Sequence, residues 1–223
     1  MIIFSKRTYF CISEAFLLLL SGLLFRASPQ ALAGSIVVGY GTPGSCTEAA
    51  LNTALVGSGT ISFDCGASPH TITLTSEKLI SQTTTVDGGN LITLSGNSSV
   101  RIFHVAQNVT FSVSNMTLEN GRTSAEGGAI YADENTTLTV NNVTFSGNVS
   151  TQTAENYAGG GAISVERRSQ ATVIDSRFNN NQAGNGGAIA IGGWDSNDEG
   201  GTRLVQASSF NSNVATETGG IAG

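Results

Sequence analysis

Four segments in the second half of the chain align with one another without a gap, and this internal repeat restricts the fold more than any other feature of the sequence. The aligned segments are 111–118, 138–145, 171–178 and 203–210. Each is followed by a pair of glycines, and three of these pairs continue as Gly-Gly-Ala-Ile, at 127–130, 160–163 and 186–189. Such a repeat is typical of a solenoid, in which each repeat forms one coil and packs against its neighbours.

Residues of one kind recur at the same position of successive repeats. The columns are Val113, Val140, Val173 and Val205; Leu118, Phe145, Phe178 and Phe210; and Asn148, Asn181 and Asn213. Paired strands lie about 4.8 Å apart, so a column in the sequence becomes a stack of touching side chains in space. Apolar stacks fill a core, and stacked asparagines can share side-chain amide hydrogen bonds. We therefore predict that these columns are the structural stacks of the fold.

The apolar pattern within a segment predicts a corner. In 138–145 the apolar residues alternate in each half, but Asn141 and Asn142 interrupt the alternation. A straight strand would turn the second half toward solvent, whereas a corner between two short strands keeps both halves inside. The glycine pairs are expected to supply conformations that glycine adopts at little cost. The prediction is an all-β fold, a right-handed parallel β-helix (solenoid).

The first coils have a different pattern. Ser45-Cys-Thr-Glu48 fits a helix capping box, and apolar residues follow at helical spacing up to Leu55. Gly57 and Gly59 then end the helix, and a strand begins at Thr60. We predict a short N-terminal capping helix that covers the open end of the core. The expected organisation is an N-terminal cap over 34–65, containing the helix and the first strand, and β-helix repeats over 66–223.

The first 33 residues have the features of a secretory signal peptide. Lys6 and Arg7 precede an apolar run over 16–25, and Ala31-Leu32-Ala33 is a small-x-small cleavage pattern. A membrane anchor is the alternative, although the run is shorter than the roughly 20 residues that span a bilayer. We predict a signal peptide over 1–33 and, after its cleavage, no integral membrane segment.

Export bears on the cysteines and on the partners. Cys46 and Cys65 would enter an oxidising compartment, where a disulfide between them is expected, with two free thiols as the alternative.

The formal net charge of −6 argues against nucleic acid as a partner. The sequence contains no Cys-x-x-Cys and no cluster of cysteine and histidine, so we expect no zinc and no other cofactor.

Two motifs together resemble a known family. Phe-x-x-Asn occurs at 145–148, 178–181 and 210–213, in repeats that carry the Gly-Gly-Ala-Ile motif. This pairing resembles the polymorphic outer membrane protein repeat of chlamydial surface adhesins and other bacterial surface proteins. The resemblance implies a secreted or cell-surface protein, with the outer membrane as one location, and covers the chain from Thr110 onward. The cap helix likewise resembles the caps of pectate-lyase-like β-helices.

The repeats depart from the family pattern at both ends. The first reads Leu118-Glu-Asn-Gly121 and the last Gly219-Gly-Ile-Ala222. The sequence stops within a repeat, so we expect that the native array continues past Gly223. Autotransport in the manner of the family is in doubt for the sequence as it stands.

Catalytic chemistry has little support in the sequence. Polysaccharide-cleaving β-helix enzymes need carboxylates on neighbouring coils. The acids of this chain are scattered along the sequence, and no second acid shares a column with Asp175. Arg177 lies in a column with Thr117, Thr144 and Ser209 and is interpreted as a surface substitution. We expect no catalytic residues and a non-enzymatic scaffold for adhesion or ligand presentation, with a host-cell, glycan or protein ligand. The alternatives are a polysaccharide lyase or hydrolase of the pectate-lyase-like class and a purely structural stalk.

One loop offers candidate ligand-binding residues. Asp195, Asn197 and Glu199 resemble the start of a calcium-binding loop, but Gln206 stands where such a loop has glutamate. A plain acidic loop is therefore favoured over a metal site. Trp194 beside it is a weak candidate for stacking on a sugar or anchoring a partner.

Overall fold

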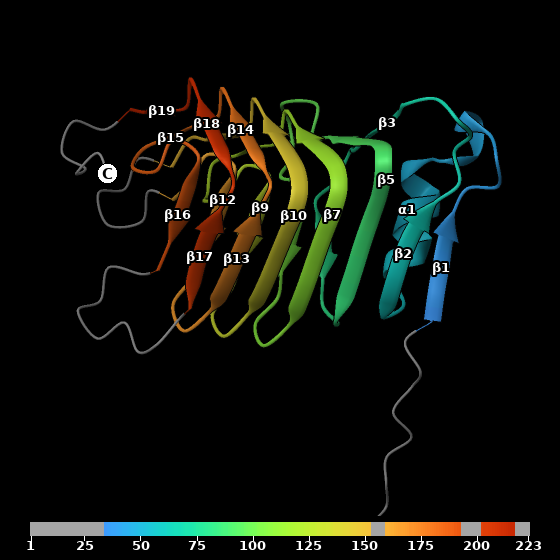
Figure 1. The fold of residues 1–223 in the computed structure, drawn as a ribbon, viewed down its shortest axis with the longest axis horizontal. Coiled ribbons are helices and arrows are strands. Elements are labelled where there is room, and N and C mark those ends of the chain that lie inside the picture. The colour runs from blue at the N-terminus through green and yellow to red at the C-terminus, as the bar shows by residue number, and fades with distance from the viewer. Residues whose placement is uncertain (1–33, 153–158, 193–201, 217–223) are drawn as a thin grey trace, which may run out of the picture. The chain divides into compact units, whose positions relative to one another are not determined.

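The computed structural model describes residues 34–152, 159–192 and 202–216 (Figure 1). The signal peptide predicted for 1–33 lies outside these residues, as do Trp194, Asp195, Asn197 and Glu199. Every strand pairing among the described residues is parallel, and they contain one α-helix and one short 3-10 helix. The predicted all-β class with parallel sheets is confirmed.

The strands form three sheets. The first sheet contains β1 (Gly34–Val38), β2 (Gly59–Phe63), β3 (His70–Thr73), β5 (Thr84–Ser95), β7 (Thr110–Glu119), β10 (Thr137–Ser146), β13 (Gln170–Ile174), β14 (Arg177–Asn179), β17 (Arg203–Gln206) and β18 (Ser209–Asn211). The second contains β4 (Lys78–Ile80), β6 (Phe103–Val105), β9 (Ile130–Ala132), β12 (Ile163–Val165) and β16 (Ile189–Ile191). The third contains β8 (Arg122–Thr123), β11 (Val149–Ser150), β15 (Gln182–Ala183) and β19 (Val214–Ala215).

Strands that follow one another in the later repeats belong to different sheets. After β7 in the first sheet, the chain enters the third sheet at β8 and the second at β9, and returns to the first at β10 beside β7. The same order recurs through β11, β12 and β13, so successive repeats add strands to all three sheets. Figure 1 shows the strands of the first sheet side by side in chain order.

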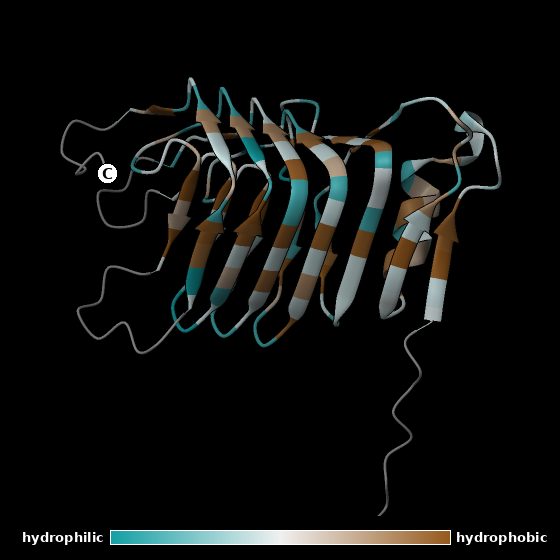
Figure 2. Ribbon diagram, viewed as in Figure 1, coloured by the Kyte–Doolittle hydropathy of each residue, from teal (hydrophilic) through white to brown (hydrophobic). Residues whose placement is uncertain are grey.

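The core lies between the sheets and is built from one side of each strand. In β10 the inward residues Leu138, Val140, Val143 and Phe145 are at most 1% exposed. Apolar bands accordingly recur on neighbouring strands of the first sheet (Figure 2). Burial of such side chains contributes roughly 25 cal/mol per Å² of apolar surface removed from water and is the main stabilising term of this fold.

The predicted corner is a bend rather than a break in β7 and β10. Both strands continue through it, while the next repeat divides into β13 and β14. The residue at the bend has a left-handed backbone in each repeat, with φ of 54° at Asn115, 53° at Asn142, 51° at Asp175 and 50° at Ala207. Asn and Asp tolerate this conformation better than other non-glycine residues, which explains the polar residues at three of these four positions.

The glycine pairs serve a purpose other than the expected one. Gly127 has a positive φ of 65°, but for Gly128, Gly160 and Gly161 no such φ occurs. A Cβ on Gly128 would lie 2.5 Å from the backbone oxygen of Gly161, in the next coil. At most of these positions, therefore, close approach of successive backbones requires glycine, and unusual conformation does not.

The capping helix is present but begins later than the sequence suggested. Helix α1 spans Glu48–Leu55, and its N-cap is Thr47, whose hydroxyl accepts a hydrogen bond from the Ala50 N–H at 3.2 Å. The capping box proposed at Ser45 is wrong, because Ser45 ends the 3-10 helix η2 (Pro43–Ser45) and its hydroxyl bonds to Thr42 O instead. No described helix is long and apolar enough to cross a membrane.

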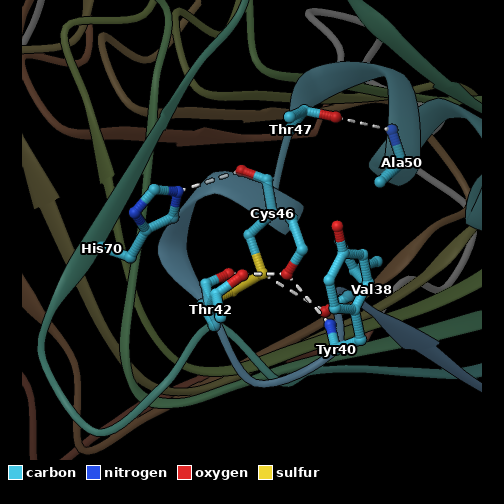
Figure 3. Close-up of a disulfide and its surroundings, with 9 residues drawn as sticks. Val38, Tyr40, Thr42, Cys46, Thr47, Ala50 and His70 are labelled. Carbon is cyan, nitrogen blue, oxygen red and sulfur yellow. Dashed lines mark hydrogen bonds between the residues drawn. A yellow bond between two sulfur atoms is a disulfide. The ribbon is translucent and has the colours of Figure 1, made fainter.

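A disulfide joins Cys46, just before α1, to Cys65, just after β2 (Figure 3). Both cysteines are 3% exposed. The His70 imidazole lies beside them, with Nε2 2.9 Å from the Cys46 carbonyl oxygen. The bond therefore fastens the helical cap to the end of β2 in the first sheet.

Candidate functional site

The structure brings the residues of each expected stack together. In-register pairing joins Val113, Val140, Val173 and Val205, and it joins Leu118, Phe145, Phe178 and Phe210. The phenylalanine rings are nearly parallel, with centroids 4.7 Å apart for Phe145 and Phe178 and 4.8 Å for Phe178 and Phe210. These spacings match the distance between paired strands, so the ring stack follows from the backbone register.

The asparagine stack is a continuous hydrogen-bonded ladder. Asn148 and Asn181 are fully buried, and the Asn148 Nδ2 donates to Asn181 Oδ1 at 3.0 Å. Asn181 Nδ2 donates in the same way to Asn213 Oδ1 at 2.9 Å. Each side chain also accepts from a backbone N–H of the preceding coil and donates to a backbone carbonyl, as when Asn181 Nδ2 donates to Phe145 O. The ladder thereby satisfies buried polar groups that would otherwise be costly.

A column with three polar members lies on the outer side of the second sheet. Its in-register residues are Leu79, His104, Tyr131, Ser164 and Ala190. In β6 the flanking Phe103 and Val105 are fully buried, so His104 between them points away from the core. We call this column and the charged groups that contact it the polar face.

His104 connects charged groups of successive coils. Its Nδ1 lies 3.3 Å from Glu77 Oε1, and its Nε2 lies 3.2 Å from Asp133 Oδ2. Glu77 also accepts a hydrogen bond from Arg101 Nη1 at 2.7 Å. The Arg101 guanidinium in turn lies 5.0 Å from the centre of the Tyr131 ring, within cation–π range. His104 is therefore held by two carboxylates.

Three further groups extend the polar face. The Tyr131 hydroxyl lies 3.3 Å from Glu166 Oε1, and the Ser164 hydroxyl donates to Glu126 Oε2 at 2.6 Å. Burial raises the pKa of the Glu126 carboxyl; the Ser164 hydrogen bond lowers it, and the Glu166 charge raises it further. Burial, together with the neighbouring carboxylates, also raises the pKa of Tyr131. Glu126 therefore holds a proton more readily than an ordinary glutamate.

An acidic cleft of about 350 Å³ opens beside this network. It is lined by Gln107, Tyr131, Asp133, Glu134 and Glu166. Glu134 is neutralised by Arg167, whose Nε donates to it at 3.0 Å. The cleft therefore offers carboxylates, an amide and an aromatic ring to a ligand.

This gathering of acids corrects one sequence-based interpretation. The acids were expected to be scattered, yet Glu77, Glu126, Asp133, Glu134 and Glu166 occupy one side of the second sheet. Part of the arrangement was visible in the repeat, since Asp133 and Glu166 each lie three residues after the isoleucine of Gly-Gly-Ala-Ile. Glu77 and Glu126 could not be placed in this way, because they fall outside the aligned segments.

No group of three or more His, Cys, Asp or Glu residues within 34–152, 159–192 and 202–216 is arranged to hold a metal ion. The carboxylates of the polar face instead interact with His104, Arg101, Tyr131 and Ser164. The site is therefore suited to hydrogen bonding and to charge recognition.

Comparison with known families supports the repeat assignment. The model of the Chlamydia polymorphic membrane protein repeat matches residues 142–166 and 175–192, so the chain carries repeats of the polymorphic membrane protein family. These residues include the Phe-x-x-Asn and Gly-Gly-Ala-Ile motifs of two coils. The family points to a protein of the cell surface or outer membrane. No curated protein and no solved structure matches the chain.

Proposed function

We propose that this chain is an exported, non-enzymatic scaffold of the bacterial surface, whose polar face binds a ligand in adhesion. Its architecture would be a right-handed parallel β-helix, closed by the α1 cap. Three features support this proposal: the parallel pairing, the repeats that add strands to all three sheets in the same order, and the matched surface-protein repeat. We further propose that the signal peptide is removed after Ala33 and that a glycan or protein of a host cell is the partner.

The observation that carries the binding role is the acidic cleft. A scaffold alone needs buried stacks, but it does not need a tyrosine, an amide and three carboxylates around an open cleft on its outer side. Tyrosine combines an apolar ring with a hydroxyl, which suits it to ligand contact. Tyr131 lies on β9, and the other lining residues follow the ends of β6, β9 and β12, which pair in register.

Binding of the labelled full chain to cultured epithelial cells tests the adhesion role. The wild type should bind saturably, and the double variant Tyr131→Ala/Glu166→Gln should bind at least about tenfold more weakly. Tyr40→Ala is the matched control, since Tyr40 is 79% exposed and does not line the cleft. Binding that does not saturate, or that survives the double variant, would favour a structural stalk.

A polysaccharide lyase or hydrolase is the second candidate, and one observation favours it. Glu126, with its raised pKa, interacts electrostatically with Glu166, and such a pair can divide acid and base roles. Incubation with pectin and related polymers, followed by assays for reducing ends and unsaturated sugars, tests this activity. Product release by the wild type that Glu126→Gln abolishes would establish an enzyme; no release from any polymer would exclude this substrate class.

A further inference from the structure

A second concave site lies on the outer side of the first sheet, at the bend. It is a groove of about 270 Å³, and its lining includes Thr93, Thr117, Thr144, Arg177, Asn90 and Asn142. The three threonines and Arg177 occupy one in-register column across four successive coils. We call it the threonine groove; it shares no lining residue with the acidic cleft.

The threonine hydroxyls form a regular row. Paired strands place them about 4.8 Å apart, so the row spans roughly 10 Å along the groove. Thr93, Thr117 and Thr144 are each half-buried, and none of their hydroxyls makes a hydrogen bond to another described residue. Each hydroxyl can therefore both donate to and accept from a ligand.

Arg177 supplies positive charge at one end of the row. It is exposed, and it has no hydrogen bond or ion pair within the described part of the chain. No carboxylate lines the groove. Asp87, nearby at the bend, is engaged by the Asn115 amide at 3.0 Å and by the Gly89 N–H at 2.9 Å. Asp175, also at the bend, does not line the groove, so Arg177 is its only charged lining residue.

The amides at the bend shape the groove. Asn142 Nδ2 donates to Asn90 Oδ1 at 2.8 Å and to Asn115 Oδ1 at 2.9 Å, which links three coils. The wall is thereby fixed before a ligand arrives, and a fixed wall loses little entropy on binding. Rigid backbone, aligned hydroxyls and one free guanidinium are the elements of an oligosaccharide site that selects for negative charge.

We propose that the threonine groove binds an acidic carbohydrate, with a carboxylate or sulfate paired to Arg177 and sugar hydroxyls bonded along the threonine row. A guanidinium pairs with either oxyanion through two parallel hydrogen bonds. The acidic cleft would repel the same ligand, so the two sites take ligands of different charge. This inference does not depend on binding at the polar face.

Isothermal titration of the full chain with three probes tests the proposal. The probes are a heparin-derived tetrasaccharide (sulfated), trigalacturonic acid (carboxylate only) and maltotriose (neutral). At least one acidic probe should bind, and maltotriose should bind at least about tenfold more weakly. Binding of one acidic probe but not the other identifies the anion, whereas binding of neither overturns the proposal. Equal affinity for maltotriose and the acidic probes also overturns it.

Matched variants locate the binding. Arg177→Gln should weaken the acidic probe about tenfold or more, while Arg122→Gln, which removes another exposed charge outside the groove, should change affinity less than twofold. Thr144→Val should weaken binding severalfold, while Thr139→Val, outward on the same strand but outside the groove, should not. Equal losses in the two arginine variants would reveal unspecific charge attraction and overturn the site. Loss of probe binding in Arg177→Gln with unchanged cell binding would leave both proposals standing as separate functions.

Discussion

The first coils and the later coils of the described chain are held together by different contacts. Around the cap, the contacts are ones that do not recur from coil to coil, such as the Cys46–Cys65 disulfide and the ion pair between Lys78 and Glu48. From β7 onward, the same residue type contacts itself from coil to coil, as in the stack of Phe145, Phe178 and Phe210. A repeat array can extend by adding equal contacts, whereas its open end needs contacts that occur once.

Truncation of a central ring should have the largest effect on stability. Phe178 is fully buried between two parallel rings, so Phe178→Ala should lower the free energy of unfolding by about 3–5 kcal/mol. Phe210→Ala removes the same ring type at a position that is 50% exposed, and should cost about 1 kcal/mol. Urea unfolding followed by circular dichroism measures both. Equal losses would mean that the stack does not stabilise through burial.

Removal of the disulfide should destabilise the other region. The bond closes a sequence separation of 19 residues, so Cys46→Ser/Cys65→Ser should cost about 3 kcal/mol. The double substitution leaves the later coils chemically unchanged. Hydrogen exchange should therefore rise first in β1 and β2, with β10 and β13 protected for longer. Uniform loss of protection would contradict the separation of the two regions.

The asparagine ladder should contribute less than the rings but more than an exposed asparagine. Asn181→Ala removes the hydrogen bonds that its side chain makes to the buried Asn148 amide and to the Phe145 carbonyl. It should lower the free energy of unfolding by about 2 kcal/mol. Asn141→Ala, at an exposed position of β10, should stay within about 0.5 kcal/mol of the wild type. Thermal unfolding compares the two. A ladder variant as stable as the control would show that water replaces the lost bonds.

The Glu48–Lys78 pair should give a smaller effect that depends on pH. Burial raises the pKa of Glu48, but hydrogen bonds from Lys78, Thr75 and Ser76 outweigh it and lower the pKa from 4.5 to about 2. A carboxyl whose pKa is lower in the folded state than in the unfolded chain stabilises the fold at pH values above its unfolded-state pKa. This contribution is lost as the pH falls from about 4.5 to about 2.

Glu48→Gln should therefore destabilise the protein by roughly 1–2 kcal/mol at neutral pH, because Lys78 keeps a buried charge without its partner. The difference between wild type and variant should shrink toward zero near pH 2. Glu119→Gln, an acid outside the pair, serves as the control. A difference that stays constant from pH 7 to pH 2 would contradict the assigned pKa.

The same contrast explains what the sequence could predict. The valine, phenylalanine and asparagine columns were predictable because each occurs several times, and every repeat is an independent observation of one environment. Contacts that occur once give no such signal. Glu48 and Lys78 are 30 residues apart, and only the course of the chain between them brings them together.

The polar face was missed for a related reason. Alternation with Phe103 and Val105 is enough to place His104 on the outer side of its strand. Glu77 and Asp133, however, reach it from other coils. Their positions depend on turns whose lengths differ from repeat to repeat. The helix start was misplaced because Ser45 and Thr47 are both good N-caps, and the 3-10 turn at Pro43–Ser45 decides between them.

The central claim is that successive repeats stack in register as coils of a parallel β-helix. Pulsed electron paramagnetic resonance can test this claim by measuring distances between spin labels. The labels are attached to cysteines introduced at Thr60, Thr139 and Thr172 in a Cys11→Ser background. Register pairing places Thr139 three coils and Thr172 four coils from Thr60. The account predicts distances of about 14 and 19 Å, one coil spacing apart. Equal distances, or a difference far from about 5 Å, would contradict the stacked arrangement.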